Sequence, residues 1–231
     1  MLEIAGIPVA VQRKRIKHLH LYVKPPDGHV LVTAPLAMSD AAIEQFVSSK
    51  ADWLQTHVAR FAGRPAPVMM RYETGETLLV FGRLYRLLVQ QGGRYALTLS
   101  GDTAVLTARG GSTPAQREAH VWAWYRALLA QEIARRMPTW ETATGLRASG
   151  FQIKRMSTRW GTCNIKTRKI WFSLHLAEKS PECLDYIILH ELLHLRERGH
   201  NARFYALLGH YMPGWKQYKD RLNNKAPRAA Q

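Results

Sequence analysis

Cysteine is scarce in this sequence, which contains only Cys163 and Cys183. Two cysteines are too few for the disulfide framework of a small secreted domain, and these two do not form a CxxC pair. We therefore expect both to be reduced thiols in the core of a cytoplasmic protein.

Long apolar runs are also missing, since no stretch approaches the roughly 18 residues that indicate a transmembrane helix. The N-terminus, MLEIAGIPVAVQRKRIKH, places its basic cluster after a short apolar segment, the reverse of the order in a secretory signal peptide. No internal repeat and no low-complexity tract is apparent. These absences argue against a membrane protein, an exported protein and a repeat architecture.

Acidic residues are few, because 17 Asp and Glu face 33 Lys and Arg, which gives a net charge of +16. Such a balance favours encounters with polyanions such as nucleotides, nucleic acids or anionic membranes. A basic surface that serves only solubility is an equally open interpretation. The hydrophobic fraction of 46% is that of a folded globular protein and excludes a disordered chain.

The N-terminal half is predicted to be rich in β-structure. Residues 9–33 alternate loosely around the turn PPDGH, which indicates a hairpin. Ser39 is the expected N-cap of an amphipathic helix that reaches about residue 62. Residues 76–90 and 94–108 are β-type runs separated by glycine turns, which suggests an antiparallel meander.

The C-terminal half is predicted to be mostly helical. A helix is expected over 114–137, then two or three short strands, then a helix with Ser180 as N-cap and Pro181 in its first turn. Gly199 is expected to end that helix in the left-handed conformation, and Asn201 to cap the next one. The fold class is therefore α+β, with a β-rich region over residues 1–112 and a helical domain over 113–231.

The stretch HELLHLRERGH at residues 190–200 carries the clearest chemical signal. His190 and His194 are four residues apart, so a helix places both imidazoles on one face, within reach of one metal ion. Glu191 lies about 100° round the helix, where it can contact a metal-bound water without binding the metal. Surface helices also carry this spacing without a metal, but the capped helix and the nearby third histidine favour a metal site.

A third ligand is expected, because catalytic zinc usually has three protein ligands and one open position. Glu197 lies on the same helical face, but a straight helix would spread residues 190, 194 and 197 over about 10 Å. If the chain turns at Gly199, His200 approaches from another direction. We favour His200 and interpret Glu197 as a solvated or supporting acid.

Zinc, or another divalent transition metal, would lower the pKa of its bound water towards neutrality. Glu191 would accept the proton from that water and pass it to the leaving group. This arrangement predicts a metal-dependent hydrolase.

A basic segment precedes the motif, because no acidic residue occurs between Glu141 and Glu178. If it lies beside the metal, it could hold an anionic substrate, with Arg155 and Arg159 as candidate phosphate contacts. An exposed strand edge protected by lysines is the alternative. The seven basic residues are Arg147, Lys154, Arg155, Arg159, Lys166, Arg168 and Lys169.

Four segments resemble the YgjP-like metallohydrolases, bacterial zincin-type proteins related to minigluzincins and more distantly to SprT-like proteins. The segments are TRWGTC at 158–163, DYIILHELLHL at 185–195, HNARFYALL at 200–208 and MPGWKQYKDRL at 212–222. The resemblance implies a zincin-like domain with His190, His194 and His200 as metal ligands and Glu191 as catalytic base. It also suggests that Arg159, Trp160 and Gly161 shape the cleft. Thr162 departs mildly from the family's frequent serine.

The resemblance leaves two reactions open. Members are associated with hydrolysis of UTP to the monophosphate and pyrophosphate, whereas the family name implies peptide cleavage. A peptidase needs an edge strand for extended substrate, and a pyrophosphohydrolase needs several cations around the phosphates. The basic segment tips the prediction towards UTP. A nucleic-acid-linked function is a third hypothesis, less favoured because no DNA-binding motif is present.

Overall fold

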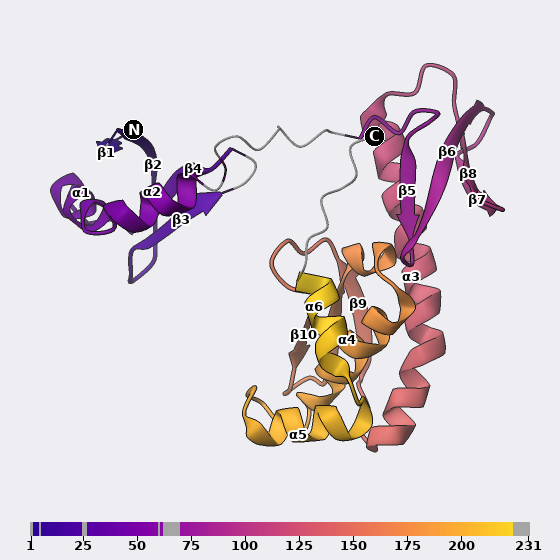
Figure 1. The fold of residues 1–231 in the computed structure, drawn as a ribbon. Coiled ribbons are helices and arrows are strands. Elements are labelled where there is room, and N and C mark those ends of the chain that lie inside the picture. Colours follow the sequence, from indigo (N-terminus) through magenta and orange to yellow (C-terminus); the bar gives the residue numbers. More distant parts are fainter. Residues whose placement is uncertain (1, 5, 25–26, 60, 62–69, 224–231) are drawn as a thin grey trace. The chain divides into compact units, whose positions relative to one another are not determined.

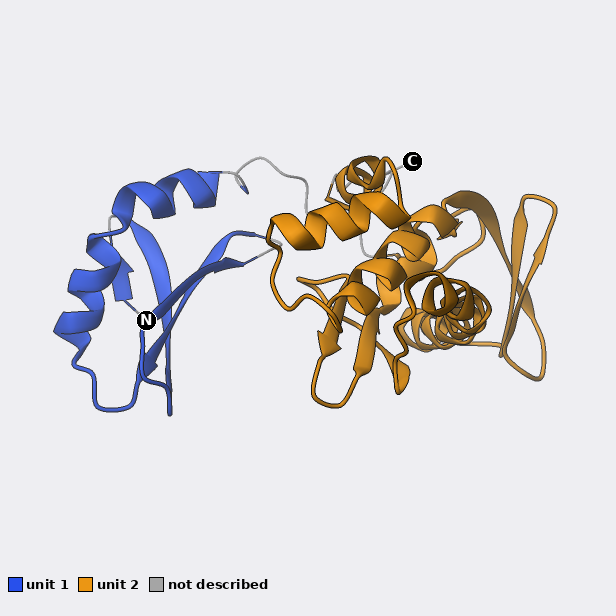
Figure 2. Cartoon of the chain, turned by 90° about the horizontal axis from the view of Figure 1, so that it is seen from below, with its two compact units in different colours: residues 1–69 blue, residues 70–231 orange. Residues whose placement is uncertain are grey.

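The computed structural model describes residues 2–4, 6–24, 27–59, 61 and 70–223 (Figure 1). The chain forms two compact units, residues 1–69 and 70–231, shown in separate colours in Figure 2. Each unit has its own cluster of buried hydrophobic side chains. No helix among the described residues is long and apolar enough to cross a membrane.

Unit 1 is a four-stranded sheet with two helices. The sheet order is β1-β2-β4-β3, with β2 parallel to β4 and β3 antiparallel to β4. The β3–β4 pair confirms the predicted hairpin, although the run that begins before it is a separate strand, β2. The elements are β1 (Leu2–Ile4), β2 (Ile7–Lys14), β3 (His20–Lys24), β4 (His29–Pro35), α1 (Asp40–Ser48) and α2 (Ala51–Ala59).

The expected single helix after residue 39 is interrupted. Ser39 caps α1 as predicted, because its side chain accepts a hydrogen bond from the Ala42 amide. The helix then stops at Ser49 and restarts at Ala51. The buried side chains Ile43, Val47 and Leu54 nevertheless pack on the same core.

The first sheet of unit 2 repeats the strand order of unit 1. Its order is β5-β6-β8-β7, and β6 is parallel to β8, as β2 is to β4. The predicted antiparallel meander is therefore wrong, because β8 pairs with β6 and leaves β7 at the edge. The strands are β5 (Thr77–Val80), β6 (Arg83–Gln91), β7 (Ala96–Ser100) and β8 (Thr103–Ala108).

A long helix, α3 (Pro114–Thr144), follows this sheet. Thr113 and Gln116 form a capping box at its start, and Gly145 ends it with φ of 70°. The helix runs seven residues beyond the predicted range because it continues through Pro138. Buried side chains along it include Val121, Tyr125, Leu129 and Ile133, which recur at helical spacing.

The C-terminal part combines a three-stranded sheet with three helices. The sheet order is β10-β11-β9, so β10 is an edge strand, and α4 contacts α3, α5, α6 and β10. The three short strands and the start of α4 at Pro181 agree with the sequence prediction. The elements are β9 (Gly150–Lys154), β10 (Gly161–Asn164), β11 (Lys169–Ser173), a 3-10 turn (Leu174–Glu178), α4 (Pro181–Leu193), α5 (Ala202–Tyr211) and α6 (Trp215–Asn223).

The division into units differs from the boundary expected at residues 112 and 113. The sheet over residues 77–108 shares its buried core with α3 and α4, so it belongs to the same unit as the metal motif. Cys183 is buried and Cys163 is half-buried, and both are free thiols as expected.

Candidate metal centre

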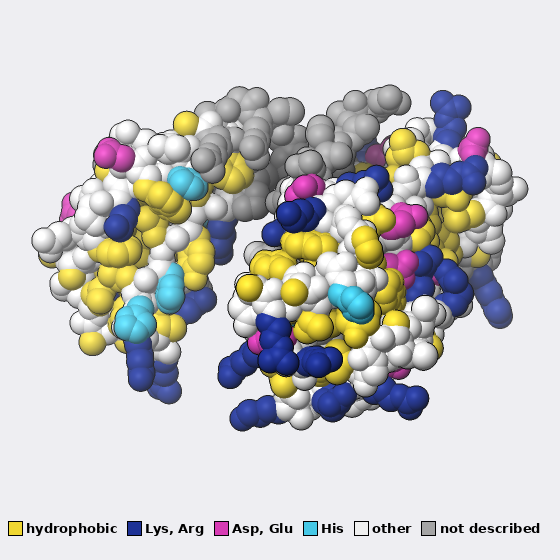
Figure 3. All heavy atoms as spheres, turned by 60° about the horizontal axis from the view of Figure 1, so that its bottom comes forward, with side chains coloured by type: hydrophobic (Ala, Val, Ile, Leu, Met, Phe, Trp, Pro, Cys, Tyr) yellow, Lys and Arg dark blue, Asp and Glu magenta, His cyan; other side chains and the backbone are white. Residues whose placement is uncertain are grey.

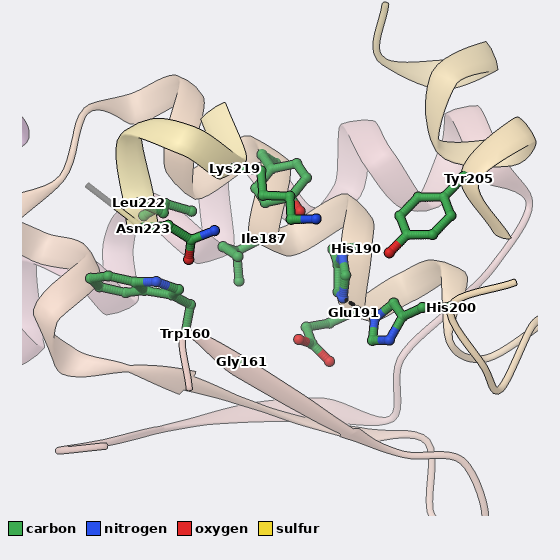
Figure 4. Close-up of a pocket in the computed structure, with 11 residues that line it drawn as sticks. Trp160, Gly161, Ile187, His190, Glu191, His200, Tyr205, Lys219, Leu222 and Asn223 are labelled. Atoms are coloured by element: carbon green, nitrogen blue, oxygen red, sulfur yellow. Dashed lines mark hydrogen bonds between the residues drawn. The ribbon is translucent and has the colours of Figure 1, made fainter. Parts of the chain in front are cut away.

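Three histidine side chains meet where α4 ends and α5 begins. His190 lies in the last turn of α4, His194 is its C-cap residue, and His200 precedes Asn201, the N-cap of α5. One ring nitrogen from each lies within 4.8 Å of the others. The Nε2 atoms of His190 and His200 are 2.9 Å apart (Figure 4). The structure thus brings together the three residues that the motif predicts.

The connection between the helices differs in one detail from the expected one. The helix stops at Leu193 and a turn follows, in which the Leu195 amide donates to the Leu192 carbonyl oxygen. Gly199 therefore lies in an irregular segment, and its φ is outside the left-handed region, contrary to the prediction. The Asn201 cap is as expected, because its Oδ1 accepts a hydrogen bond from the Phe204 amide at 2.9 Å.

Phe204 forms a common support for the three imidazoles. Its ring is fully buried, and its centroid lies 4.9 Å from the ring centroids of His190, His194 and His200. The sequence shows Phe204 only as an apolar residue of the segment HNARFYALL. Its position under the site follows from the way α5 folds back on α4, which spacing alone does not reveal.

Glu197 supports the site without joining it. Its backbone carbonyl oxygen lies 3.1 Å from Nδ1 of His194 and accepts the hydrogen bond, which leaves Nε2 as the free nitrogen. Its carboxylate accepts a hydrogen bond from Asn201 at 3.1 Å and lies 3.6 Å from Arg203. The Glu197 carboxylate is therefore bound by Asn201 and Arg203 beside the histidine cluster.

The histidine cluster has the donor set that a divalent transition metal requires. Burial, together with the neighbouring His194, His200 and Lys219, lowers the pKa of His190 to about 3. Its imidazole is thus neutral at physiological pH, which is the form that binds metals. Nδ1 of this buried ring has no hydrogen-bond partner within the described chain. Three imidazoles that converge in this way, without a carboxylate among them, fit a zinc site.

Glu191 lies beside the histidines in an apolar setting. Its side chain is only 4% exposed, and Oε2 has no partner among the described residues. Burial raises the pKa of Glu191 to about 8, although the nearby Arg159 opposes the shift. A carboxylate with so few stabilising contacts has a strong tendency to take a proton.

Gly161 leaves the space that Glu191 occupies. A Cβ atom on this glycine would lie 2.5 Å from Oε1, 2.7 Å from Cγ and 2.8 Å from Cδ of Glu191. No such approach is tolerated between real side chains. The glycine of the TRWGTC segment is therefore required by the close contact of β10 with the acid.

A cavity of about 320 Å³ opens beside the histidines and Glu191 (Figure 4). Tyr205 points its hydroxyl towards the histidines, and Trp160 lies at the opposite end. Lys219 is the only Lys or Arg among the described residues that line the cavity. The lining residues beyond His190, His200 and Glu191 are Trp160, Gly161, Tyr186, Ile187, Tyr205, Lys219, Leu222 and Asn223.

Aromatic rings hold Lys219 at the rim of this cavity. Trp215 stacks between Tyr186 and Tyr205, with centroid distances of 6.4 and 5.2 Å. The Lys219 ammonium lies 5.7 Å from the Trp215 centroid and 5.9 Å from that of Tyr205. None of these residues was predicted to belong to the site, although the WKQYKDRL segment does carry a periodic aromatic and basic pattern.

Arg155 and Arg159, the two candidate phosphate contacts, lie in different surroundings. Arg155 donates to Glu118 at 3.0 Å and lies over the Trp122 ring at 4.6 Å, so it is held against α3. Arg159 is exposed and affects Glu191 electrostatically, but it does not line the cavity. Of the basic segment, only Trp160 and Gly161 reach the cavity wall.

Residues 17–225 match the family described as YgjP-like, metallopeptidase domain. No curated protein matches the chain at a significant level. The metallopeptidase zymogen abylysin of Pyrococcus abyssi is 20% identical over 40% of this chain and 93% of its own, with a TM-score of 0.38. The metallopeptidase zymogen jannalysin of Methanocaldococcus jannaschii is 23% identical over 40% of this chain and 95% of its own, with a TM-score of 0.37. Because the family match spans most of the sequence, this chain belongs to the YgjP-like family and is a metal-dependent hydrolase.

Proposed function

We propose that this enzyme is a zinc-dependent peptidase that cleaves extended polypeptide substrates. His190, His194 and His200 hold the metal, and Glu191 is the general base. When bound there, the metal would act as a Lewis acid on the substrate carbonyl and on water. Glu191 accepts a proton from the attacking water and delivers it to the departing amine.

The observation that carries this proposal is the position of β10. It is an edge strand of its sheet, and its first residue, Gly161, contacts Glu191. An edge strand has unpaired backbone donors and acceptors that can align an extended peptide as an additional strand. Substrate bound along β10 would therefore pass next to the base and the histidines.

The cavity lining also favours a peptide. Its walls are largely apolar and aromatic, with Trp160, Ile187 and Leu222 available for a substrate side chain. Tyr205 and Lys219 are the donors available for the negative charge that develops on the carbonyl oxygen. Burial, followed by nearby acidic groups, raises the pKa of the adjacent Tyr186 to about 12, so the Tyr186 hydroxyl remains protonated.

Hydrolysis of a nucleoside triphosphate such as UTP is the second candidate. Lys219 at the cavity and Arg159 near Glu191 favour it, as does the net charge of +16. A triphosphate normally requires several cations at one place. Because Arg155 is bound to Glu118, the basic segment supports this reaction less than its composition suggested.

The test offers zinc-loaded protein an unstructured polypeptide and UTP in parallel. We expect new peptide termini by mass spectrometry and no release of pyrophosphate. Glu191→Gln should reduce cleavage by roughly 10²- to 10⁴-fold, whereas Glu182→Gln, an exposed acid in the first turn of the same helix, should not. Pyrophosphate release that requires Glu191, with the polypeptide intact, would select the second candidate.

A further inference from the structure

The sheet of unit 1 has one face that its helices leave open. Side chains alternate across each strand, and Val9, Val30 and Val32 point towards α1 and α2 in the buried core. The opposite positions face away from this core, and those on β3 (His20, Tyr22 and Lys24) are all exposed. Tyr22 lies on this face at β3, an edge strand of the sheet.

Tyr22 is the centre of a small aromatic and basic cluster. Its side chain is 43% exposed, and its ring stacks on that of His20 with centroids 6.2 Å apart and 28° between the planes. The Lys24 ammonium lies 5.9 Å from the centroid of the tyrosine ring. Across the pairing with β4, Leu31 lies opposite Tyr22, so a flat apolar surface continues from the ring into the sheet.

The surrounding segment carries positive charge alone. Between Glu3 and Asp27 the sequence contains no further acidic residue. Arg13 is bound to Asp40 at 2.6 Å, but the other basic residues of the segment form no ion pair with any described residue. Those four exposed residues are Lys14, Arg15, Lys17 and Lys24. Figure 3 shows histidine side chains beside Lys and Arg side chains on the surface of this unit.

We propose that this open sheet face binds single-stranded nucleic acid. The Lys and Arg side chains that form no ion pair favour a polyanionic ligand. The stacked rings of Tyr22 and His20 favour unstacked bases, because such bases stack on aromatic side chains. Duplex nucleic acid keeps its bases stacked and offers no such faces. An anionic membrane would favour apolar side chains that protrude, whereas the residues beside Tyr22 on the same face of β3 are His20 and Lys24. The surface belongs to unit 1 and the histidine cluster to unit 2, and the proposal does not depend on the proposed peptidase activity.

Fluorescence anisotropy of the full chain with a labelled oligothymidylate about 12 nucleotides long tests this proposal. Tyr22→Ala should weaken binding by at least about tenfold, whereas Tyr22→Phe, which keeps the ring, should bind as the wild type does. Lys24→Gln should reduce the slope of log K against log salt concentration by about 0.7, the value for one phosphate contact of a single strand. Circular dichroism of each variant establishes that unit 1 is folded.

Trp53→Ala is the matched control, because Trp53 is 41% exposed and stacks on His57 at 4.0 Å, but lies on α2. It should leave oligonucleotide binding unchanged. Equal affinity for a duplex of the same length, with no effect of Tyr22→Ala, would show unspecific charge attraction and overturn the proposal. Binding to vesicles that contain phosphatidylserine, without binding to the oligonucleotide, would overturn it as well.

Discussion

The backbone at Gly161 lies so close to Glu191 that one methyl group decides where the acid can be. In Gly161→Ala the new Cβ would lie 2.5 Å from Oε1, so the carboxylate must move. Because a general base acts only within hydrogen-bond reach, we expect kcat to fall by about 10²-fold or more. The histidines are untouched, so zinc content measured by elemental analysis should remain stoichiometric.

Gly93→Ala is the matched control for this change, because nothing lies within 4 Å of the position that its Cβ would take. A double variant gives a sharper comparison. Glu191→Asp withdraws the carboxylate from β10, so adding Gly161→Ala to it should cost much less than adding Gly161→Ala to the wild type. Independent, additive losses would contradict a steric relation between the two residues.

Cys163 is predicted to be a poorly reactive thiol. Burial, with a smaller effect of Glu191, raises the pKa of Cys163 to about 11, from an ordinary 9.0. The thiolate fraction at pH 8 is then about a hundredfold lower than for an ordinary cysteine, and the thiolate is the reactive form. Mass spectrometry should find Cys163 unmodified after iodoacetamide treatment of folded protein and modified after denaturation. Rapid modification of the folded chain would contradict this environment.

The residues of the metal motif could be predicted because each carries its chemistry in its spacing. The roles of His190, His194 and Glu191 follow from their spacing within one helix turn. His200 was chosen as the third ligand because ligands in a straight row along one helix cannot converge on one metal ion. Phe204 and Lys219 could not be predicted in the same way. Their places under and beside the histidines depend on how α5 and α6 pack on α4, and no local pattern encodes that packing.

The start of α5 is the element on which the third ligand depends. Asn201 caps this helix through the Phe204 amide and also donates to Glu197. Asn201→Ala should cost about 1 kcal/mol of stability, and it should also loosen the neighbouring His200. We expect zinc affinity, measured by competition with a chromogenic chelator, to fall by about tenfold or more.

Thr113→Ala provides a matched cap deletion away from the metal. Thr113 caps α3 through the Gln116 amide, as Asn201 caps α5. It should cost a similar amount of stability and leave zinc affinity unchanged. If both variants weaken zinc binding equally, the effect of Asn201 is one of general stability and not of ligand placement.

The helices with strong local signals were predicted at the right places, whereas the elements that pack or pair with one another were not. Ser39 and Asn201 mark helix starts because their side chains accept a local capping hydrogen bond. Ser180 takes the predicted N-cap position before Pro181, but its side chain makes no capping hydrogen bond. The long helix passes through Pro138, where local rules predict a break, because contacts beyond it compensate. Trp140 donates to Asp185 at 3.0 Å on the neighbouring helix. The order of β5 to β8 was likewise missed, since strand pairing depends on contacts remote in sequence.

At the scale of the whole molecule, composition proved a weak guide to location. The acid-free segment was expected to line the cleft, but Arg155 is bound to α3, and Lys154 lies over the Trp171 ring at 5.1 Å. Net charge shows that the surface is basic, not which part of it faces a substrate. The boundary expected near residue 112 failed for a similar reason, because a sheet that looks like an N-terminal module shares its core with the helices.

The two separate cores predict two unfolding transitions that respond differently to the metal. Ligands that bind only the folded state stabilise it by RT ln(1 + [L]/Kd), about 4 kcal/mol at a thousandfold excess over Kd. Only residues 70–231 contain the histidine cluster, so chelation should lower one transition by roughly 5–15 °C and leave the other in place. Differential scanning calorimetry with and without chelator measures both.

Leu54→Ala, in the core of unit 1, should lower only the metal-independent transition. His200→Ala should remove the response to chelator, whereas a single transition that shifts as a whole would contradict independent cores.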